Sequence, residues 1–109
     1  MDKPIMLNTT TDFEFCDGTK TKLTLAFYHL YKLRNNHKNL YDRYNKIMQE
    51  TNGNSFDILD MVTICYIGYM CANMDEENVL TEEEFMMLCG SDMNNVGKAV
   101  KALVNPKNK

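Results

Sequence analysis

The sequence lacks the patterns that most often carry catalysis or cofactor binding. It has no Cys-x-x-Cys pair, no glycine-rich run that could cradle a phosphate, and no serine in a nucleophile-elbow sequence. Its two histidines, His29 and His37, have no Cys, Asp or second His four residues further on. We therefore expect a protein that is not an enzyme and that needs no cofactor.

Long apolar runs are also missing. The longest uncharged stretch, Met61 to Met74, is shorter than the ~20 apolar residues that cross a bilayer. The opening residues contain acids and lack the apolar core of a secretory signal. The cysteines have spacings that suit neither a zinc site nor a disulfide framework: Cys16, Cys65, Cys71 and Cys89. These absences predict a cytoplasmic protein with free thiols and no membrane contact.

One sign of charge is absent from a large part of the chain. Residues 47–97 contain ten Asp or Glu and no Lys or Arg, whereas residues 20–46 contain seven Lys or Arg and one acid. The net charge of −3 argues against general nucleic-acid binding. Two blocks of opposite sign suit contact with another protein or with a second copy of the chain. The residues predicted to form the basic side of self-association are Lys32, Arg34, Lys38 and Arg43.

The chain is predicted to begin with an N-terminal arm, residues 1–10, and a β-hairpin. Residues 11–16 and 20–26 alternate apolar and polar side chains, and Asp17-Gly18 between them is a strong turn signal. Helical spacing follows, with a break at Asn35-Asn36 and a second amphipathic helix over about 37–50. The apolar set expected in the first of these helices is Phe27, Leu30, Tyr31 and Leu33.

A helix that is apolar on almost every side is predicted over about 55–74, with Asn54 or Ser55 as its N-cap. A helix without a polar face is normally enclosed by others, so this one should lie at the centre of the core. Gly68 should allow a neighbouring segment to approach closely. A capping box from Thr81 to Glu84 then begins a short helix, and a last amphipathic helix follows.

The predicted fold class is therefore α+β. An N-terminal β-hairpin is followed by about five helices packed round the central apolar helix, 55–74. A single domain of this kind covers residues 11–106, and residues 107–109 form a polar tail.

Residues 73–84, with the sequence NMDEENVLTEEE, partly match the loop of a calcium-binding EF-hand. Asn replaces the usual Asp at its first position, Asn78 replaces the usual Gly at its sixth, and no second loop exists. The capping box explains Thr81 and Glu84 without a metal, so we expect none. The residues that a single calcium site would use are Asn73, Asp75, Glu77 and Glu84.

Nine methionines occur in 109 residues, and most lie in the second half of the chain. Methionine fills irregular cores and also lines adaptable binding grooves. No helix buries four consecutive residues equally, so some of residues 85–88 should be exposed and mark a protein-binding site. The predicted partner-binding residues are Phe85, Met86, Met87 and Met93.

The order of these segments resembles a known family. Five segments follow one another along the chain. They are DFEF–DG–KLTLAFYHLYKLRN, NLYDRYNKIM, the apolar DMVTICYIGYMCAN, LTEEEFMML and the closing GKAVKALVNPKNK. This pattern, over about residues 11–106, resembles the tail assembly chaperones of long-tailed bacteriophages and prophages of Firmicutes. The resemblance implies a non-enzymatic protein that binds the tape measure protein and keeps it soluble in the host cytoplasm. It also implies self-association, absence from the mature virion and, in many members, a longer frameshifted product.

Two other functions stay open at this point. The basic segment 20–46 interleaves tyrosines with cations and would suit a small regulatory protein or one that binds nucleic acid. Residues 73–84 would suit a single-loop calcium protein. The chaperone hypothesis differs from both because it predicts capture of a long helical partner and indifference to calcium and nucleic acid.

Overall fold

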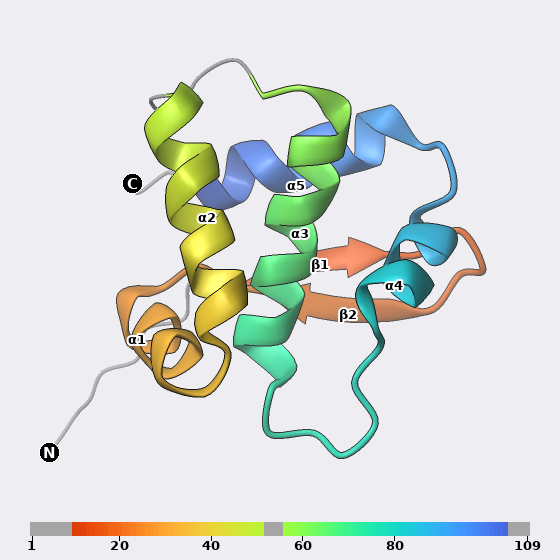
Figure 1. Ribbon diagram of the computed structural model, residues 1–109. Coiled ribbons are helices and arrows are strands. Elements are labelled where there is room, and N and C mark those ends of the chain that lie inside the picture. Colours follow the sequence, from red (N-terminus) through yellow and green to blue (C-terminus); the bar gives the residue numbers. More distant parts are fainter. Residues whose placement is uncertain (1–9, 52–55, 105–109) are drawn as a thin grey trace, which may run out of the picture.

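The computed structural model describes residues 10–51 and 56–104, which form a two-stranded hairpin followed by five helices (Figure 1). The predicted α+β class is confirmed. The N-terminal arm up to residue 9, the residues from 105 onward and the expected caps Asn54 and Ser55 lie outside the described residues. The elements are β1 Thr11–Glu14, β2 Lys20–Leu23, α1 Phe27–Asn36, α2 Lys38–Thr51, α3 Ile58–Asn73, α4 Glu82–Cys89 and α5 Met93–Val104.

The hairpin forms at the position that the alternating pattern predicted, but its strands are shorter than the predicted ranges 11–16 and 20–26. β1 pairs antiparallel with β2, with Thr11 opposite Leu23 and Glu14 opposite Lys20. The turn is closed by Asp17, whose Oδ1 accepts hydrogen bonds from the N–H and the hydroxyl of Thr19 at 3.0 and 2.7 Å. Gly18 has φ +90°, a conformation that residues with a Cβ rarely adopt.

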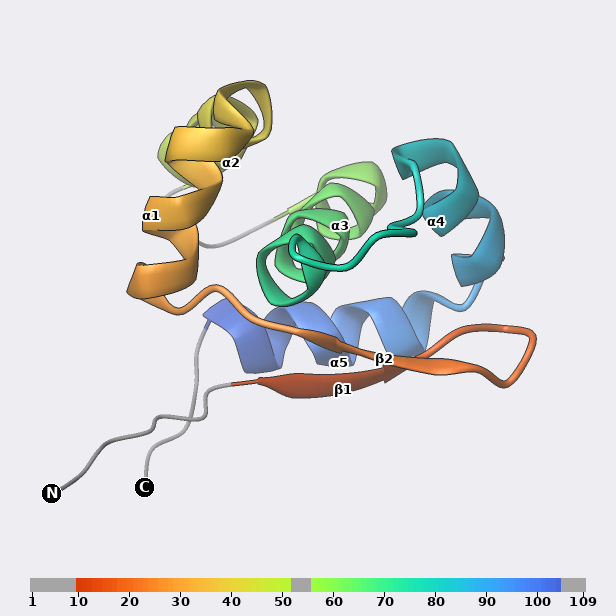
Figure 2. The same cartoon turned by 90° about the horizontal axis from the view of Figure 1, so that it is seen from below.

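Helix α3 is the centre of the molecule, as its apolar sequence predicted. Every residue from Val62 to Cys71 is buried. In Figure 2, α1 and α2 lie on one side of α3, α4 lies on the other, and α5 and the hairpin pass beneath it. The helix begins at Ile58, later than expected, because Asp57 is its N-cap: Asp57 Oδ1 accepts the N–H of Asp60 at 2.8 Å.

Gly68 is a point of close approach between α3 and its neighbours, which confirms its expected role. A Cβ at this position would lie 3.3 Å from both Leu23 Cβ and Leu103 Cδ1. The carbonyl oxygen of Gly68 also accepts the N–H of Thr24 at 3.1 Å. The end of β2 is thereby joined to the middle of α3.

Five aromatic rings form the part of the core between the hairpin, α3 and α4. Phe85 is fully buried, and its ring lies 5.4–5.8 Å from those of Phe13, Phe15, Tyr66 and Tyr69. The two tyrosines also fix the segment that leads into α4. The hydroxyl of Tyr66 donates to the carbonyl of Leu80 at 3.0 Å, and that of Tyr69 accepts the Leu80 N–H at 2.8 Å.

No helix among the described residues has the length and apolar character needed to cross a membrane.

Candidate protein-binding surface

The predicted partner-binding residues on α4 do not share one environment. Phe85 is fully buried, so the exposure predicted for it is wrong; α4 turns this position toward the hairpin and α3. Met86 is half-buried and packs against the core. Met87, on the outer side of α4, is 76% exposed. Phe85 and Met87 are two residues apart, about 200° round the helix, so the core aromatic and the surface methionine lie on opposite sides of α4.

An apolar patch lies where α3 and α5 begin and α4 ends. Ile58 is 37% exposed and Met93 63% exposed, and both line a hollow of about 40 Å³. The apolar floor of the hollow comes from Val62, Cys89 and Val96. We call these five residues the apolar end patch. Met93 was predicted as a binding residue, so the structure brings it together with side chains that the sequence did not single out.

Ile58 was missed because the predicted helix began too early. With a cap at residue 54 or 55, Ile58 falls inside the first turn of a helix that is apolar all round, and burial is expected. With Asp57 as the cap, Ile58 is the first helical residue and projects beyond the core. The adjacent Leu59 is exposed as well, at 64%. The Asp57-x-x-Asp60 spacing was the available signal for the true start.

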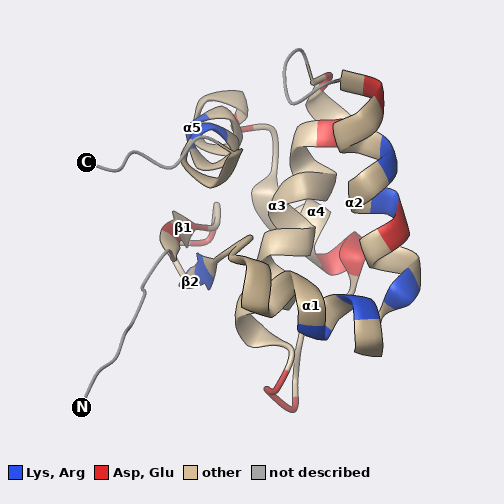
Figure 3. Cartoon of the chain, turned by 90° about the vertical axis from the view of Figure 1, so that its left-hand side faces the viewer, with Lys and Arg blue, Asp and Glu red and all other residues tan. Residues whose placement is uncertain are grey.

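The basic residues predicted for self-association are largely engaged within the chain. Lys32 pairs with Asp75 at 3.1 Å, Lys38 with Asp42 at 3.0 Å, and Arg43 with Glu82 at 2.7 Å. The fourth, Arg34, lies over the rings of Tyr31 and Tyr41, with 5.6 and 5.9 Å between its guanidinium carbon and the ring centroids. Lys and Arg are concentrated on α1 and α2, beside acidic residues of the same chain (Figure 3). The role of these four residues in self-association stays a prediction.

Arg43 and Glu82 form the strongest of these pairs, and we predict its effect on stability. Two parallel bonds of 2.7 and 2.8 Å join α2 to the first turn of α4. The bond from Arg43 lowers the pKa of Glu82 below its ordinary value of 4.5, so the stabilisation is complete above that value and is lost as pH falls through the folded pKa. Glu82→Gln should lower the free energy of unfolding by about 0.5–1 kcal/mol near neutral pH.

Urea denaturation across pH measures this effect. The difference between wild type and Glu82→Gln should shrink as the pH is lowered from about 5 toward 3. Asp42→Asn, which breaks the exposed pair between Lys38 and Asp42 within one helix, is the matched control and should have the smaller effect. A difference for Glu82→Gln that does not change with pH would contradict this assignment.

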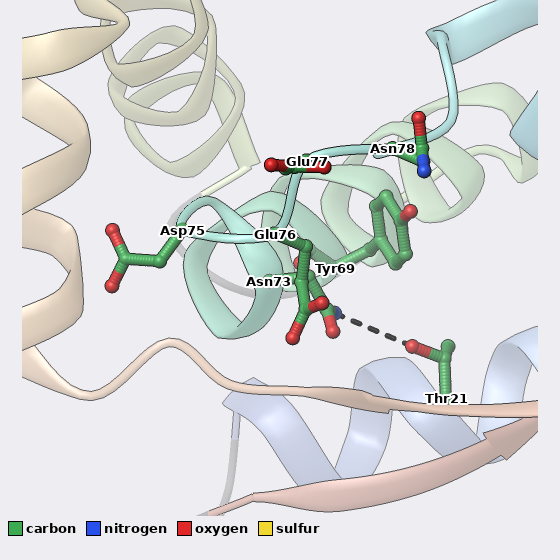
Figure 4. A pocket seen from close by; sticks show the side chains of 7 residues that line it. All are labelled: Thr21, Tyr69, Asn73, Asp75, Glu76, Glu77 and Asn78. Carbon is green, nitrogen blue, oxygen red and sulfur yellow. Dashed lines mark hydrogen bonds between the residues drawn. The ribbon is translucent and has the colours of Figure 1, made fainter.

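An open acidic hollow of about 690 Å³ lies where the calcium loop was considered. Figure 4 shows that the side chains of Asp75 and Glu77 point in different directions. Asn73 is used structurally, because its side-chain N–H groups donate to the carbonyl oxygens of Lys22 and Tyr69 at 3.1 and 2.9 Å. The residues that line the hollow are Thr21, Tyr69, Asn73, Asp75, Glu76, Glu77 and Asn78.

The last predicted calcium ligand, Glu84, belongs to the capping box. Its Oε1 accepts the Thr81 N–H at 2.9 Å, and the Thr81 hydroxyl accepts the Glu84 N–H at 3.2 Å. The predicted capping box is confirmed. Within the described ranges, no group of three or more His, Cys, Asp or Glu side chains is placed to hold a metal ion. Within this loop, Glu84 therefore takes part in the cap of α4, and Asp75 takes part in an ion pair with Lys32.

A second exposed apolar surface lies on α1. Of the predicted apolar set, Leu30 and Leu33 are buried, whereas Phe27 is 90% exposed and Tyr31 54% exposed. Tyr28, beside them, is also exposed. The helix is covered by α2 and α3 along a narrow stripe only, and positions 27, 28 and 31 lie outside it. We call Phe27, Tyr28 and Tyr31 the aromatic face of α1.

The four thiols differ in their predicted reactivity. Cys16 is exposed, whereas burial raises the pKa of Cys65 and Cys71 to about 12 and that of Cys89 to about 11. Because the thiolate is the reactive form, only Cys16 should react rapidly with a disulfide reagent in the folded protein. A colorimetric thiol titration should give one fast thiol per chain, and four after denaturation in guanidinium. More than one fast thiol in the native protein would contradict the burial of the others.

The described residues thus form a small α+β protein whose most distinctive surface features are two exposed apolar regions and an acidic hollow. Comparison of the chain with models of protein families, with curated proteins and with solved structures gave no match. The function is therefore argued from the surfaces themselves and from the resemblance stated above.

Proposed function

We propose that this chain is a tail assembly chaperone that holds a helical segment of a phage tape measure protein on its apolar end patch. It would work in the host cytoplasm, without catalysis, and would leave the client before the virion is complete. The resemblance over residues 11–106 supports this proposal. The observation that carries it is the exposure of Ile58 and Met93 beside an apolar hollow.

The patch suits weak and reversible binding of an amphipathic helix. Such a helix presents apolar side chains three or four residues apart, and one of them can enter the hollow while others cover Ile58 and Met93. The exposed fractions of these two side chains add up to about one buried apolar residue, worth ~1.5–3 kcal/mol. A single contact of this size is weak, so a long client would be retained by many copies acting together. Weak individual contacts also allow release when tail-tube subunits polymerise.

Co-expression with the tape measure protein encoded in the same genome tests the proposal. The client should be largely insoluble alone and should become soluble and co-purify when this chain is present. An unrelated small acidic protein expressed at the same level is the control for general effects. If the client stays in the pellet beside a soluble chaperone candidate, the proposal is wrong.

Nucleic-acid binding is the second candidate, because the aromatic face of α1 specifically favours it. Tyr28 and Tyr31 are exposed and lie beside cations, with Lys32 Nζ 5.8 Å from the centroid of the Tyr28 ring and Arg34 over Tyr31. Exposed rings next to cations stack on unpaired bases. Fluorescence anisotropy with single-stranded RNA should then show binding that weakens steeply with salt and that is lost in Tyr28→Ala/Tyr31→Ala. Binding that this variant retains would exclude the aromatic face as the site.

A further inference from the structure

The apolar end patch is bordered by acidic side chains. Asp57 directly precedes Ile58 at the start of α3, and Asp92 directly precedes Met93 and lines the hollow. Around them, residues 47–97 contain no Lys or Arg. An apolar surface whose rim carries one sign of charge favours partners of the opposite sign.

Among the described residues, no Lys or Arg forms an ion pair with Asp57 or Asp92. On α5 the first basic residue is Lys98, more than one helical turn beyond Met93. Lys and Arg are otherwise concentrated on α1 and α2 (Figure 3), where Lys32, Lys38 and Arg43 are paired with acids near them. The negative charge at the patch therefore faces solvent and any bound partner.

Helix N-termini reduce this charge without cancelling it. Asp57 Oδ1 accepts the Asp60 N–H at 2.8 Å, and Asp92 Oδ1 accepts the Asn95 N–H at 3.1 Å, so both carboxylates cap helices. Each helix N-terminus contributes about +0.5 of a charge, which leaves about −0.5 at each cap. A rim charge of about −1 therefore remains beside a hollow that is mostly apolar.

From this combination we infer that the apolar end patch selects a basic amphipathic helix. Apolar side chains of the bound helix cover Ile58 and Met93, and Lys or Arg on its flanks reach the carboxylates of Asp57 and Asp92. The long stems of Lys and Arg suit this position because they pack on apolar surface while their charged ends reach the rim. The inference rests on the proposed function and specifies the chemistry of the client segment.

Model peptides of ~18 residues, long enough to form a helix, test the charge preference directly. Three labelled peptides share the same leucines and carry Lys, Gln or Glu at their polar positions. Anisotropy with the full chain should rank them Lys, then Gln, then Glu, with about a tenfold gap between Lys and Gln at low salt that narrows as salt is added. Equal affinity for the Lys and Gln peptides would overturn the inference.

Neutral substitutions of the rim acids test whether these acids cause the preference for the Lys peptide. The double variant Asp57→Asn/Asp92→Asn keeps both helix caps, because Asn caps as well as Asp does. It should bind the Lys peptide about tenfold more weakly and the Gln peptide unchanged. Asp75→Asn, at the opposite end of α3, is the control and should leave the preference intact. If Asp75→Asn removes the preference and the double variant does not, the inference is wrong.

The test of the charge preference and the test of the proposed function can fail independently of each other. If the tape measure protein is solubilised but the peptides show no charge preference, only the basic character of the client helix is excluded. If the Lys peptide depends on the rim acids while the tape measure protein stays insoluble, the site is established and the chaperone proposal fails.

Discussion

Phe85→Ala should lower the free energy of unfolding by about 3–5 kcal/mol, the largest effect that we expect from a single substitution in this chain. The Phe85 ring is fully buried and contacts four other rings from the hairpin and α3. Its removal leaves a cavity whose walls belong to three different elements, so partial collapse cannot fill it. For a domain of this size, urea denaturation and a fall in melting temperature of more than ten degrees should report the loss.

The matched control for this substitution lies two residues further along the same helix. Met87→Ala removes a side chain that is 76% exposed and should change stability by less than about 0.5 kcal/mol. A loss below about 1.5 kcal/mol for Phe85→Ala would contradict the packing of the five rings. Because Phe85 is buried, any failure of this variant to hold a client should follow its loss of stability.

Ile58→Glu combined with Met93→Glu should abolish solubilisation of the tape measure protein while leaving the fold intact. Both residues are the first of their helices, where an acidic side chain is favourable to the helix dipole. A charge at each position would face the apolar side chains of the client, and burying it unpaired costs more than the contact supplies. The fraction of the tape measure protein in the soluble lysate should fall to the level seen without this chain.

The aromatic face of α1 provides the control for this experiment. Phe27→Ser removes the most exposed aromatic side chain of the described residues, on a different surface from the apolar end patch. It should leave solubilisation unchanged. If Phe27→Ser abolishes solubilisation and the double variant does not, the client binds to α1 and the assignment of the patch is wrong.

Local patterns in the sequence predicted most of the fold. The Asp17-Gly18 turn, the capping box at Thr81 and the close approach at Gly68 are short-range features, and the structure contains all three. The central position of α3 also follows from its own composition, since a helix without a polar face must be covered on every side. Each of these features can be predicted without knowing which helices and strands are neighbours in space.

The surface could not be predicted in the same way. Phe27 and Phe85 are chemically identical, yet one is 90% exposed and the other fully buried, because α1 is covered along one stripe while α4 faces the hairpin. The pairing of Arg43 with Glu82 joins residues 39 positions apart and depends on where α2 passes α4. Ile58 became a surface residue because the helix starts one residue after Asp57. Both the exposure of a side chain and its pairing with a charge depend on tertiary contacts. Partner-binding residues could not be predicted from the sequence because their prediction requires both.

Site-specific photocrosslinking in cells that co-express the client tests the central claim most directly. A photoreactive amino acid at position 93, where Met93 is 63% exposed, should form a covalent product with the tape measure protein. The same amino acid at position 27, on the aromatic face of α1, should not. A client crosslink from position 27 with none from position 93 would contradict the apolar end patch as the binding surface, and no crosslink from either would contradict the chaperone proposal itself.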